Sequence, residues 1–250
     1  MKVQICSDLH LEFSNNRKWF NKNPLIPKGE ILIIAGDTYY LNRNFGKLKF
    51  IKQVADSFEQ VYLIPGNHEY YEGFDVSTGL SPFELKIKDN VTLLNNKSIH
   101  INGVKFVFST FWSLIQHNII PIMNGMVDFR RIQFQDKPFN INHFNDLHDK
   151  AFEFVSNEVK GTEKTVVVTH HLPSQLCNSE EFKDSPLTEA FCVEKTNFIF
   201  DSEVDYWIYG HSHRNKVDFN IGNTTMLTNQ FGYIGWNEHI HFQYDKVIEI

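Results

Sequence analysis

Six short runs of hydrophobic residues along the chain have the length and composition of β-strands. Each is nearly continuous in apolar character and rich in β-branched or aromatic residues, which is typical of strands that are covered on both faces of a sheet. The runs span residues 2–6, 31–35, 61–64, 104–109, 165–169 and 206–209. The pattern therefore predicts a buried sheet core.

Two longer segments carry the spacing of amphipathic helices. Apolar residues recur at steps of three and four over residues 45–58 and again over residues 143–160, where Gly161 favours a helix end. Strands that alternate with helices early in the chain predict βαβ units. After residue 206, short strands separated by turns such as Ile221-Gly222-Asn223 replace the helical pattern. With no internal repeat or linker, we expect one α/β domain over residues 1–250.

Residues 113–142 fit neither pattern. This stretch contains Pro121, Gly125 and Pro138 and has no sustained periodicity. A long loop inside a compact domain is usually functional. Because it follows a predicted strand, we expect a lid-like loop over whatever site the strand ends form.

Composition and charge narrow the class of protein. A net charge of −6 disfavours general nucleic-acid binding, and no apolar run reaches the roughly 20 residues of a membrane span. The N-terminus becomes polar too early for a secretory signal. An odd count of 3 cysteines excludes a disulfide framework. We expect a reducing, cytoplasmic setting without a membrane partner.

Polar residues with metal-binding or catalytic chemistry follow five of the predicted strands. They are Asp8-Leu9-His10, Gly36-Asp37, Gly66-Asn67-His68-Glu69, His170-His171 and Gly210-His211-Ser212-His213. Strand C-terminal ends meet at one edge of an α/β sheet, where ligand sites form. Residues two apart on an extended segment face the same way, so we expect Asp8 to converge with His10, and His211 with His213.

Carboxylate, imidazole and amide oxygen together are ligands of zinc, manganese or iron in a site without thiolates. The set is too large for one tetrahedral ion and suits two ions that share a carboxylate. Two such ions clamp the attacking and leaving oxygens of a displacement at phosphorus. The sequence therefore predicts two divalent ions and phosphate-ester chemistry.

These five blocks, in this order, resemble those of the calcineurin-like metallophosphoesterase superfamily. The resemblance implies a four-layer α/β/β/α sandwich of two mixed sheets with a dinuclear metal site. Matched position by position, it implies that the first ion is held by Asp8, His10 and His213, that Asp37 bridges both ions, and that the second ion is held by Asn67, His170 and His211. It also implies that a metal-bridging hydroxide attacks phosphorus and that His68 protonates the leaving oxygen.

Several residues around these blocks allow more than one interpretation. We favour His170 over His171 as the ligand because it is the first residue beyond the strand, which leaves His171 as a pocket residue. Arg130 and Arg131 either contact substrate phosphate or form a surface salt bridge. Glu69 is expected to begin a turn, and no orienting partner of His68 is identified. The remaining histidines are expected to be ordinary surface or interface residues: His100, His117, His143, His148, His239 and His241.

The resemblance does not extend to the protein Ser/Thr phosphatase branch. Gly36-Asp37 continues as Thr38-Tyr39-Tyr40 and lacks the acid and arginine of that branch. We therefore expect a small phosphorylated substrate, either a phosphodiester or a phosphomonoester. A nucleotide pyrophosphatase or a nuclease is the alternative within enzymes. A non-catalytic scaffold that binds a protein partner is the alternative outside them.

Overall fold

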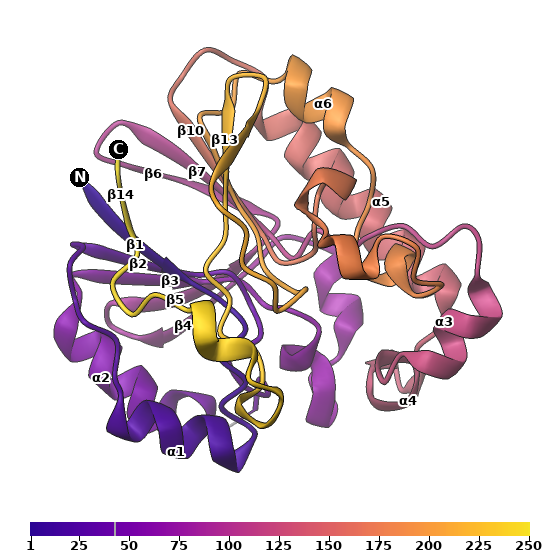
Figure 1. Cartoon of the computed structure of the whole chain (residues 1–250), viewed down its shortest axis with the longest axis horizontal. Coiled ribbons are helices and arrows are strands. Elements are labelled where there is room, and N and C mark those ends of the chain that lie inside the picture. The colour runs from indigo at the N-terminus through magenta and orange to yellow at the C-terminus, as the bar shows by residue number, and fades with distance from the viewer. Residues whose placement is uncertain (43) are drawn as a thin grey trace.

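Two β-sheets lie face to face in the computed structural model, which describes residues 1–42 and 44–250 (Figure 1). Within these residues each sheet has six strands. In order across the first sheet they are β14 (Val247–Glu249), β1 (Lys2–Cys6), β2 (Ile31–Ile34), β3 (Gln60–Leu63), β5 (Val91–Asn95) and β4 (Phe83–Lys88). In the second they are β12 (Phe219–Ile221), β13 (Thr224–Leu227), β11 (Tyr206–Ile208), β10 (Thr165–Thr169), β7 (Val104–Ser109) and β6 (Lys97–Ile101).

Both sheets have the same mixed pattern. Neighbouring strands from β1 to β5 in the first sheet, and from β13 to β7 in the second, are parallel, whereas both edge strands of each sheet are antiparallel. Parallel neighbours place their C-terminal ends on the same edge. The ends of β1, β2, β3, β10 and β11 therefore meet.

The side chains of the central strands alternate between two apolar layers. In β2, Ile31 and Ile33 pack between the sheets, whereas Leu32 and Ile34 face the helices on the outer side. In β10, Val166 and Val168 pack between the sheets and Val167 faces outward. Both faces of each sheet are buried, which explains the continuous apolar runs.

Helices cover the outer face of each sheet (Figure 1). The first sheet is covered by α1 (Ser14–Lys22) and α2 (Lys49–Ser57), and the second by α5 (Ile141–Glu158) and α6 (Thr196–Asp201). The predicted four-layer α/β/β/α sandwich is thus confirmed.

Two helix boundaries were predicted incorrectly. Residues 45–58 form a 3₁₀ turn, η1 (Phe45–Lys47), and then α2, because Leu48 has an extended ψ of 136° that breaks the helix. α5 begins two residues before the prediction, since the Asn140 side chain caps it by accepting from the His143 N–H at 3.1 Å.

The loop predicted over residues 113–142 contains regular structure, so that prediction was wrong in part. It includes α3 (Ile119–Gly125), α4 (Asp128–Arg131) and a small hairpin of β8 (Gln133–Phe134) and β9 (Lys137–Pro138). These elements are too short to show a periodicity in the sequence. Their apolar residues instead pack with Trp112, Phe144 and Leu147 in a separate core.

The late part of the chain is only partly as expected. Gly222 and Asn223 connect β12 to β13, in agreement with the predicted turn. His239 and His241 lie in the 3₁₀ turn η8 (Glu238–His241), after the last of the turns that the sequence predicted. The other 3₁₀ turns among the described residues are η2 (His68–Gly73), η3 (Val76–Leu80), η4 (Gln175–Cys177), η5 (Glu180–Phe182), η6 (Thr188–Ala190) and η7 (Ile234–Trp236). Over residues 1–42 and 44–250, no helix has both the length and the apolar character needed to cross a bilayer.

Candidate metal centre

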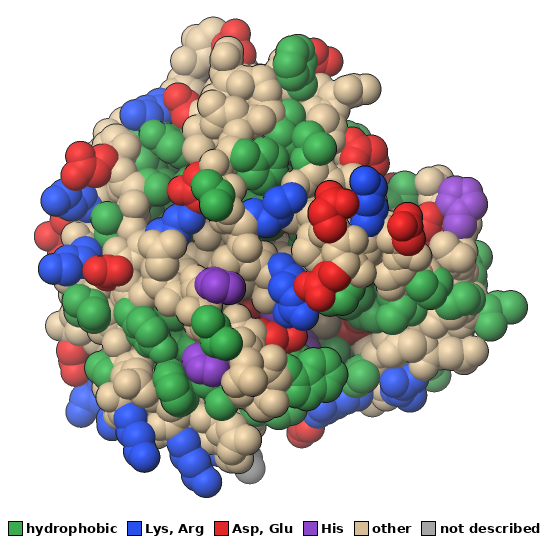
Figure 2. Space-filling view, viewed as in Figure 1, with side chains coloured by type: hydrophobic (Ala, Val, Ile, Leu, Met, Phe, Trp, Pro, Cys, Tyr) green, Lys and Arg blue, Asp and Glu red, His purple; other side chains and the backbone are tan. Residues whose placement is uncertain are grey.

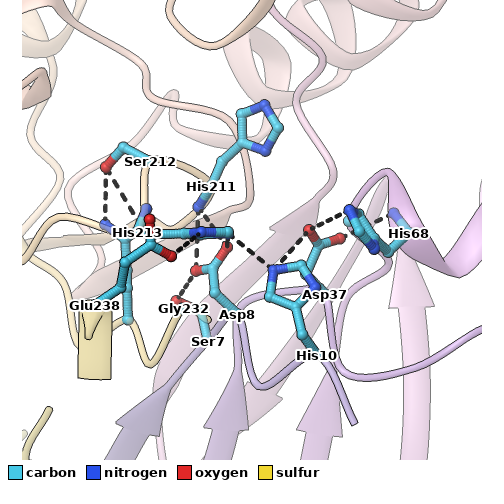
Figure 3. A network of polar contacts seen from close by, with 12 residues as sticks. Ser7, Asp8, His10, Asp37, His68, His211, Ser212, His213, Gly232 and Glu238 are labelled. Atoms are coloured by element: carbon cyan, nitrogen blue, oxygen red, sulfur yellow. Dashed lines mark hydrogen bonds and ion pairs between the residues drawn. The ribbon is translucent and has the colours of Figure 1, made fainter. Parts of the chain in front are cut away.

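The polar residues at the strand ends come together between the two sheets (Figure 3). Asp8 and His10 follow β1, Asp37 follows β2, and Asn67 and His68 follow β3. His170 comes directly after β10, and His211 and His213 come shortly after β11. Most of these side chains are buried although all are polar, which is unusual unless they bind a ligand or one another.

Backbone conformation, not strand alternation, makes these residues converge. Asp8 (φ 57°), His10 (φ 47°), Asp37 (φ 54°), His211 (φ 75°) and His213 (φ 54°) all lie in the left-handed region. The extended geometry that we expected from the spacing is therefore wrong. Each such residue costs on the order of 1 kcal/mol and persists only where its surroundings fix it. Part of that constraint is visible, because the N–H groups of Asp8 and His10 donate to the carbonyls of Gly36 and Asp37 at 3.0 and 2.9 Å.

The first group of candidate ligands is Asp8, His10, Asp37 and His213, whose ligand atoms lie within 4.8 Å of one another. His10 Nε2 is 2.8 Å from His213 Nε2 and 3.6 Å from Asp37 Oδ2. His213 Nε2 is 3.5 Å from Asp8 Oδ1. Two imidazole nitrogens and two carboxylates thus face one small volume.

Two glutamates fix how the imidazoles of His10 and His213 are oriented. His10 Nδ1 is 3.0 Å from Glu12 Oε1, and His213 Nδ1 is 2.8 Å from Glu238 Oε2. A carboxylate only accepts hydrogen bonds, so each Nδ1 carries the proton and each Nε2 of the neutral ring presents a lone pair. Two lone pairs that face each other at 2.8 Å repel unless a cation lies beside them. This donor set fits a divalent ion.

The second group is Asp37, His170 and His211, so Asp37 belongs to both groups. His170 Nδ1 lies 2.8 Å from the Ala35 carbonyl, and its Nε2 lies 3.4 Å from Asp37 Oδ1. The Nε2 atom of His211 is buried and has no hydrogen-bond partner in the part of the chain that the structure describes. An unpartnered buried nitrogen on a residue grouped with Asp37 and His170 again fits a metal ion.

Asn67 joins the second group through its amide oxygen. Its Oδ1 lies 3.3 Å from His170 Nε2, while its Nδ2 donates to Asp128 Oδ1 at 2.8 Å. Tyr71 also donates to Asp128 Oδ1, at 2.7 Å. Asp128 therefore fixes the amide so that its oxygen faces the metal group.

His68 lies beside the first group and is held by the same glutamate as His10. Its Nδ1 is 2.6 Å from Glu12 Oε1, which supplies the orienting partner that the sequence did not reveal. Burial lowers the pKa of His68, but the charge of Asp37 and the hydrogen bond to Glu12 outweigh it and raise the pKa to about 9. Burial raises the pKa of Glu12, yet its two histidine neighbours lower it to about 2.

Glu69 does more than begin a turn. It is fully buried, and its two oxygens accept from the backbone N–H groups of Asp37 (2.9 Å), Thr38 (2.7 Å) and Gly66 (2.7 Å). Burial and the charge of Asp37 raise the pKa of Glu69 to about 8. This side chain joins the loops after β2 and β3, on which Asp37 and Asn67 lie.

Gly66 is required for close approach and not for a turn. A Cβ at this position would overlap Asp37 Oδ1 and lie 2.6 Å from His170 Nε2. Gly36 has a φ of +89°, a conformation that favours glycine, and a Cβ there would also overlap His170 Nδ1.

Three acids in this site were missed by the sequence analysis: Glu12, Asp128 and Glu238. Glu12 continues the two-residue spacing of Asp8 and His10, so this spacing was a usable local indication. Asp128 is 61 residues from Asn67, and Glu238 is 25 residues from His213. Nothing local in the sequence connects either pair.

The three residues predicted to contact substrate have different positions. Arg131 lines the cavity above the metal groups, with its guanidinium carbon 4.8 Å from the Tyr71 ring centre and Nη2 2.7 Å from Glu72 Oε1. Arg130 is exposed, is not among the described lining residues, and donates to the Asn124 carbonyl at 2.8 Å. His171 is buried behind His211, with ring centres 4.2 Å apart, and is not among those lining residues either. Contact of Arg130 and His171 with substrate stays a prediction that this cavity does not support.

The remaining histidines are ordinary with one exception. His100 and His117 are exposed and pair with Glu163 and Glu189. His148, which we expected at the surface or at an interface, is buried in α5 and lies 2.6 Å from the Trp112 carbonyl. It was misassigned because an amphipathic helix can bury a polar ring that has a backbone partner.

A cavity of about 490 Å³ opens above both metal groups. Asp37, Asn67, His68, His211 and His213 are among the residues that line it. The site thus combines two groups of metal ligands, a histidine held by a carboxylate, and space for a small molecule.

Comparisons with known proteins agree with this geometry. A family model described as calcineurin-like phosphoesterase matches residues 1–215. Uncharacterized protein L509 of Acanthamoeba polyphaga mimivirus is 25% identical over 98% of this chain and 98% of that protein. UPF0046 protein K07C11.7 of Caenorhabditis elegans is 25% identical over 91% of this chain and 68% of that protein. Phosphopantetheinyl hydrolase (PptH) from Mycobacterium tuberculosis has the same fold, with a TM-score of 0.70 at 16% identity over 99% of this chain and 95% of that chain.

Proposed function

Because the chain belongs to the calcineurin-like phosphoesterase family, and is therefore a metal-dependent hydrolase of phosphate esters, we propose that it cleaves a phosphodiester or phosphomonoester by in-line displacement with two bound divalent ions. The observation that carries this proposal is the pair of Nε2 atoms of His10 and His213, which lie 2.8 Å apart between Asp8 and Asp37.

Asp8, His10, Asp37 and His213 would hold one ion, and Asp37, Asn67, His170 and His211 the other. The nitrogen and oxygen donors favour manganese, iron or zinc. When bound, the ions would lower the pKa of a water molecule to near neutrality and offset the negative charge that builds on the phosphoryl oxygens.

His68 is placed to hold a proton for the leaving oxygen. Its Nδ1 is engaged by Glu12, so the free Nε2, 3.9 Å from Asp37 Oδ2, faces the substrate side. The ring lines the cavity and is thus accessible to the ester. Proton donation from a positioned histidine accelerates such reactions by about 10²–10⁴-fold.

Arg131 is the charged group placed to orient the substrate. It lines the cavity and is stacked over the Tyr40 and Tyr71 rings, which limits its motion.

The proposed setting is the cytoplasm. In the part of the chain that the structure describes, Cys6, Cys177 and Cys192 are buried free thiols, as expected in a reducing compartment.

Metal analysis combined with an activity panel tests the proposal. The protein is purified without added metal and its metal content is measured. It is then assayed with p-nitrophenyl phosphate, its bis ester, cyclic nucleotides, dinucleotides and single-stranded DNA in the presence of manganese, iron or zinc. We expect two ions per chain and turnover of a small ester, and we expect Asp37→Asn to lose both.

Bound metal without turnover of any ester would instead support a scaffold protein. Preference for dinucleotides or DNA would replace the small-ester proposal with a pyrophosphatase or a nuclease. Fewer than two ions per chain in an active enzyme would overturn the dinuclear site.

A further inference from the structure

The cavity above the metal groups has a polar floor and apolar walls. One wall, here the first wall, consists of Phe13, Tyr233 and Trp236, and the opposite one, the second wall, consists of Met126, Leu187 and Phe191. Hydrophobic side chains gather in the corresponding region of the surface, between the C-terminal turns and the α3–α4 region (Figure 2). The volume of about 490 Å³ is that of a site for a small organic molecule.

Each wall begins directly at a metal group. In the first wall, the Tyr233 ring centre is 4.6 Å from that of His10 and 5.1 Å from that of Phe13. In the second wall, the Phe191 ring stacks on His211 with centres 4.6 Å apart. An ester with its phosphoryl group on the floor must therefore place its organic group between the two walls.

The walls are partly exposed to solvent. The exposed fractions are 77% for Trp236 and 42% for Phe13. When an apolar ligand covers exposed aromatic side chains at the mouth of a cavity, the burial of their apolar surface favours binding.

Two arginines at or near the cavity, Arg131 and Arg214, are already paired. Arg131 pairs with Glu72 at 2.7 Å. Arg214, beside the first wall, pairs with Glu181 and with Glu238 Oε1. Glu238, which pairs with Arg214 and with His213, also lines the cavity. A second phosphate outside the metal groups would thus meet paired arginines and an acid.

We infer that the substrate is an ester of a single phosphoryl group whose organic group is apolar, either an aryl group or an aliphatic chain short enough for the cavity. This inference rests on the proposed function and narrows it to one substrate class. It disfavours nucleoside diphosphates and dinucleotide pyrophosphates.

A series of unbranched alkyl esters tests the inference. Ethyl, butyl, hexyl and octyl phosphates have nearly the same leaving-group chemistry, so kcat/KM reports binding of the chain. If the enzyme is a diesterase, the corresponding alkyl p-nitrophenyl phosphates are used. We expect kcat/KM to rise about fourfold for each CH₂ group that becomes fully buried, and to level off when the cavity is full. A flat series, or a nucleoside diphosphate that surpasses octyl phosphate, would overturn the inference.

Variants of the walls provide the structural control. Trp236→Ala removes an aromatic group of the first wall, and Phe182→Ala removes a further aromatic group that lines the cavity beside the walls, so the gain from ethyl to octyl should shrink at least tenfold in each. Phe200→Ala removes an aromatic group of 62% exposure in α6, which is not among the described lining residues, and should leave the gain unchanged. An equal effect of all three variants would contradict the assignment of the walls.

Two further experiments distinguish failure of the proposed function from failure of this inference. If no ester is hydrolysed, the proposed function fails, and calorimetric binding of ethyl- to octylphosphonate to the metal-loaded protein still tests the walls by the same chain-length dependence. Dioleoyl phosphatidic acid in phosphatidylcholine vesicles tells a soluble ester from a bilayer lipid. Faster turnover of the vesicle-bound ester than of octyl phosphate would overturn the limit on chain length.

Discussion

At the scale of single residues, the site is built from backbone conformations that most side chains avoid. Asp8, His10, Asp37, His211 and His213 all have positive φ, and Asp and His tolerate this region better than β-branched or bulky residues do. Buried polar side chains in strained backbone positions are typical of functional sites. In these conformations the ligand atoms of the five residues face the two metal groups.

Replacement of Glu12 tests two roles together, the support of a metal ligand and the orientation of His68. Glu12 contacts both His10 and His68. Among the described candidate ligands and His68, Glu238 contacts only His213. We expect Glu12→Gln to weaken metal binding or activity by about 10–100-fold. It should also change the dependence of kcat on leaving-group pKa, because the orientation of His68 is lost.

Glu238→Gln is the matched control for this prediction. It should weaken metal binding but leave the leaving-group dependence as in the wild type. Metal titration, together with kcat for a series of aryl esters, measures both effects. Identical leaving-group profiles for Glu12→Gln and the wild type would show that Glu12 does not position His68.

His68→Ala should separate proton donation from metal binding. His68 forms a third group with His10 and Glu12, outside the two groups that share Asp37, so the ion content of those two groups should stay at the wild-type value. Turnover of an alkyl ester should fall by about 10²–10⁴-fold, and turnover of a p-nitrophenyl ester much less, because p-nitrophenolate leaves without a proton. Undiminished turnover of both esters would exclude His68 as the acid.

At the scale of elements, the segment between β7 and α5 contributes residues to the site although it belongs to neither six-stranded sheet. α4 carries Asp128, which holds Asn67 and Tyr71, and Arg131, which lines the cavity. Gly125 also approaches Leu187 closely, since a Cβ there would lie 2.9 Å from Leu187 Cδ2. The expectation that this segment acts as a lid stays a prediction.

Asp128→Ala should weaken the second metal position specifically. Without its acceptor, the Asn67 amide is free to rotate, and metal affinity at this position should fall by about 10–100-fold. Asp128→Asn keeps an acceptor oxygen and should recover part of the affinity. The measurement is kcat as a function of metal concentration, because excess metal should restore the turnover of Asp128→Ala.

Asp136→Asn, an exposed change in the same segment, is the control and should match the wild type. A loss in Asp128→Ala that no metal concentration restores would mean that Asp128 supports the fold and not the metal position.

At the scale of the whole molecule, the metal site connects the two sheets. Asp8, His10 and Asp37 come from the first sheet, and His170 and His213 from the second. A bound ion therefore adds cross-links to the apolar packing and the hydrogen bonds, such as the one between His170 Nδ1 and the Ala35 carbonyl, that already join the two sheets. Folded-state stability should depend on metal.

Metal removal should lower the melting temperature. A ligand at 100 times its Kd stabilises the folded state by about 2.7 kcal/mol. For a chain of this size that corresponds to a decrease of roughly 5–10 °C after chelation. Calorimetry with and without EDTA measures it, and Asp37→Asn serves as the control that should not respond. A wild-type protein with the same melting temperature in EDTA would contradict a metal that bridges the sheets.

The sequence by itself determined the central strands, the two amphipathic helices and the residues at the strand ends. Each of these depends on neighbours in the chain: a run of apolar residues, a step of three or four, or a polar residue after a strand. It did not determine α3, α4 or the β8–β9 hairpin, which are too short for a periodicity and are stabilised by packing on Trp112 and Phe144.

Only the tertiary structure decided how the chemistry is arranged. It placed His170 and not His171 against Asp37, and it placed Arg131 and not Arg130 in the cavity. It also brought Glu12 to His68 across 56 residues and Asp128 to Asn67 across 61. The physical reason is that a hydrogen bond depends on distance in space, which segments far apart in the chain acquire only when the two sheets pack.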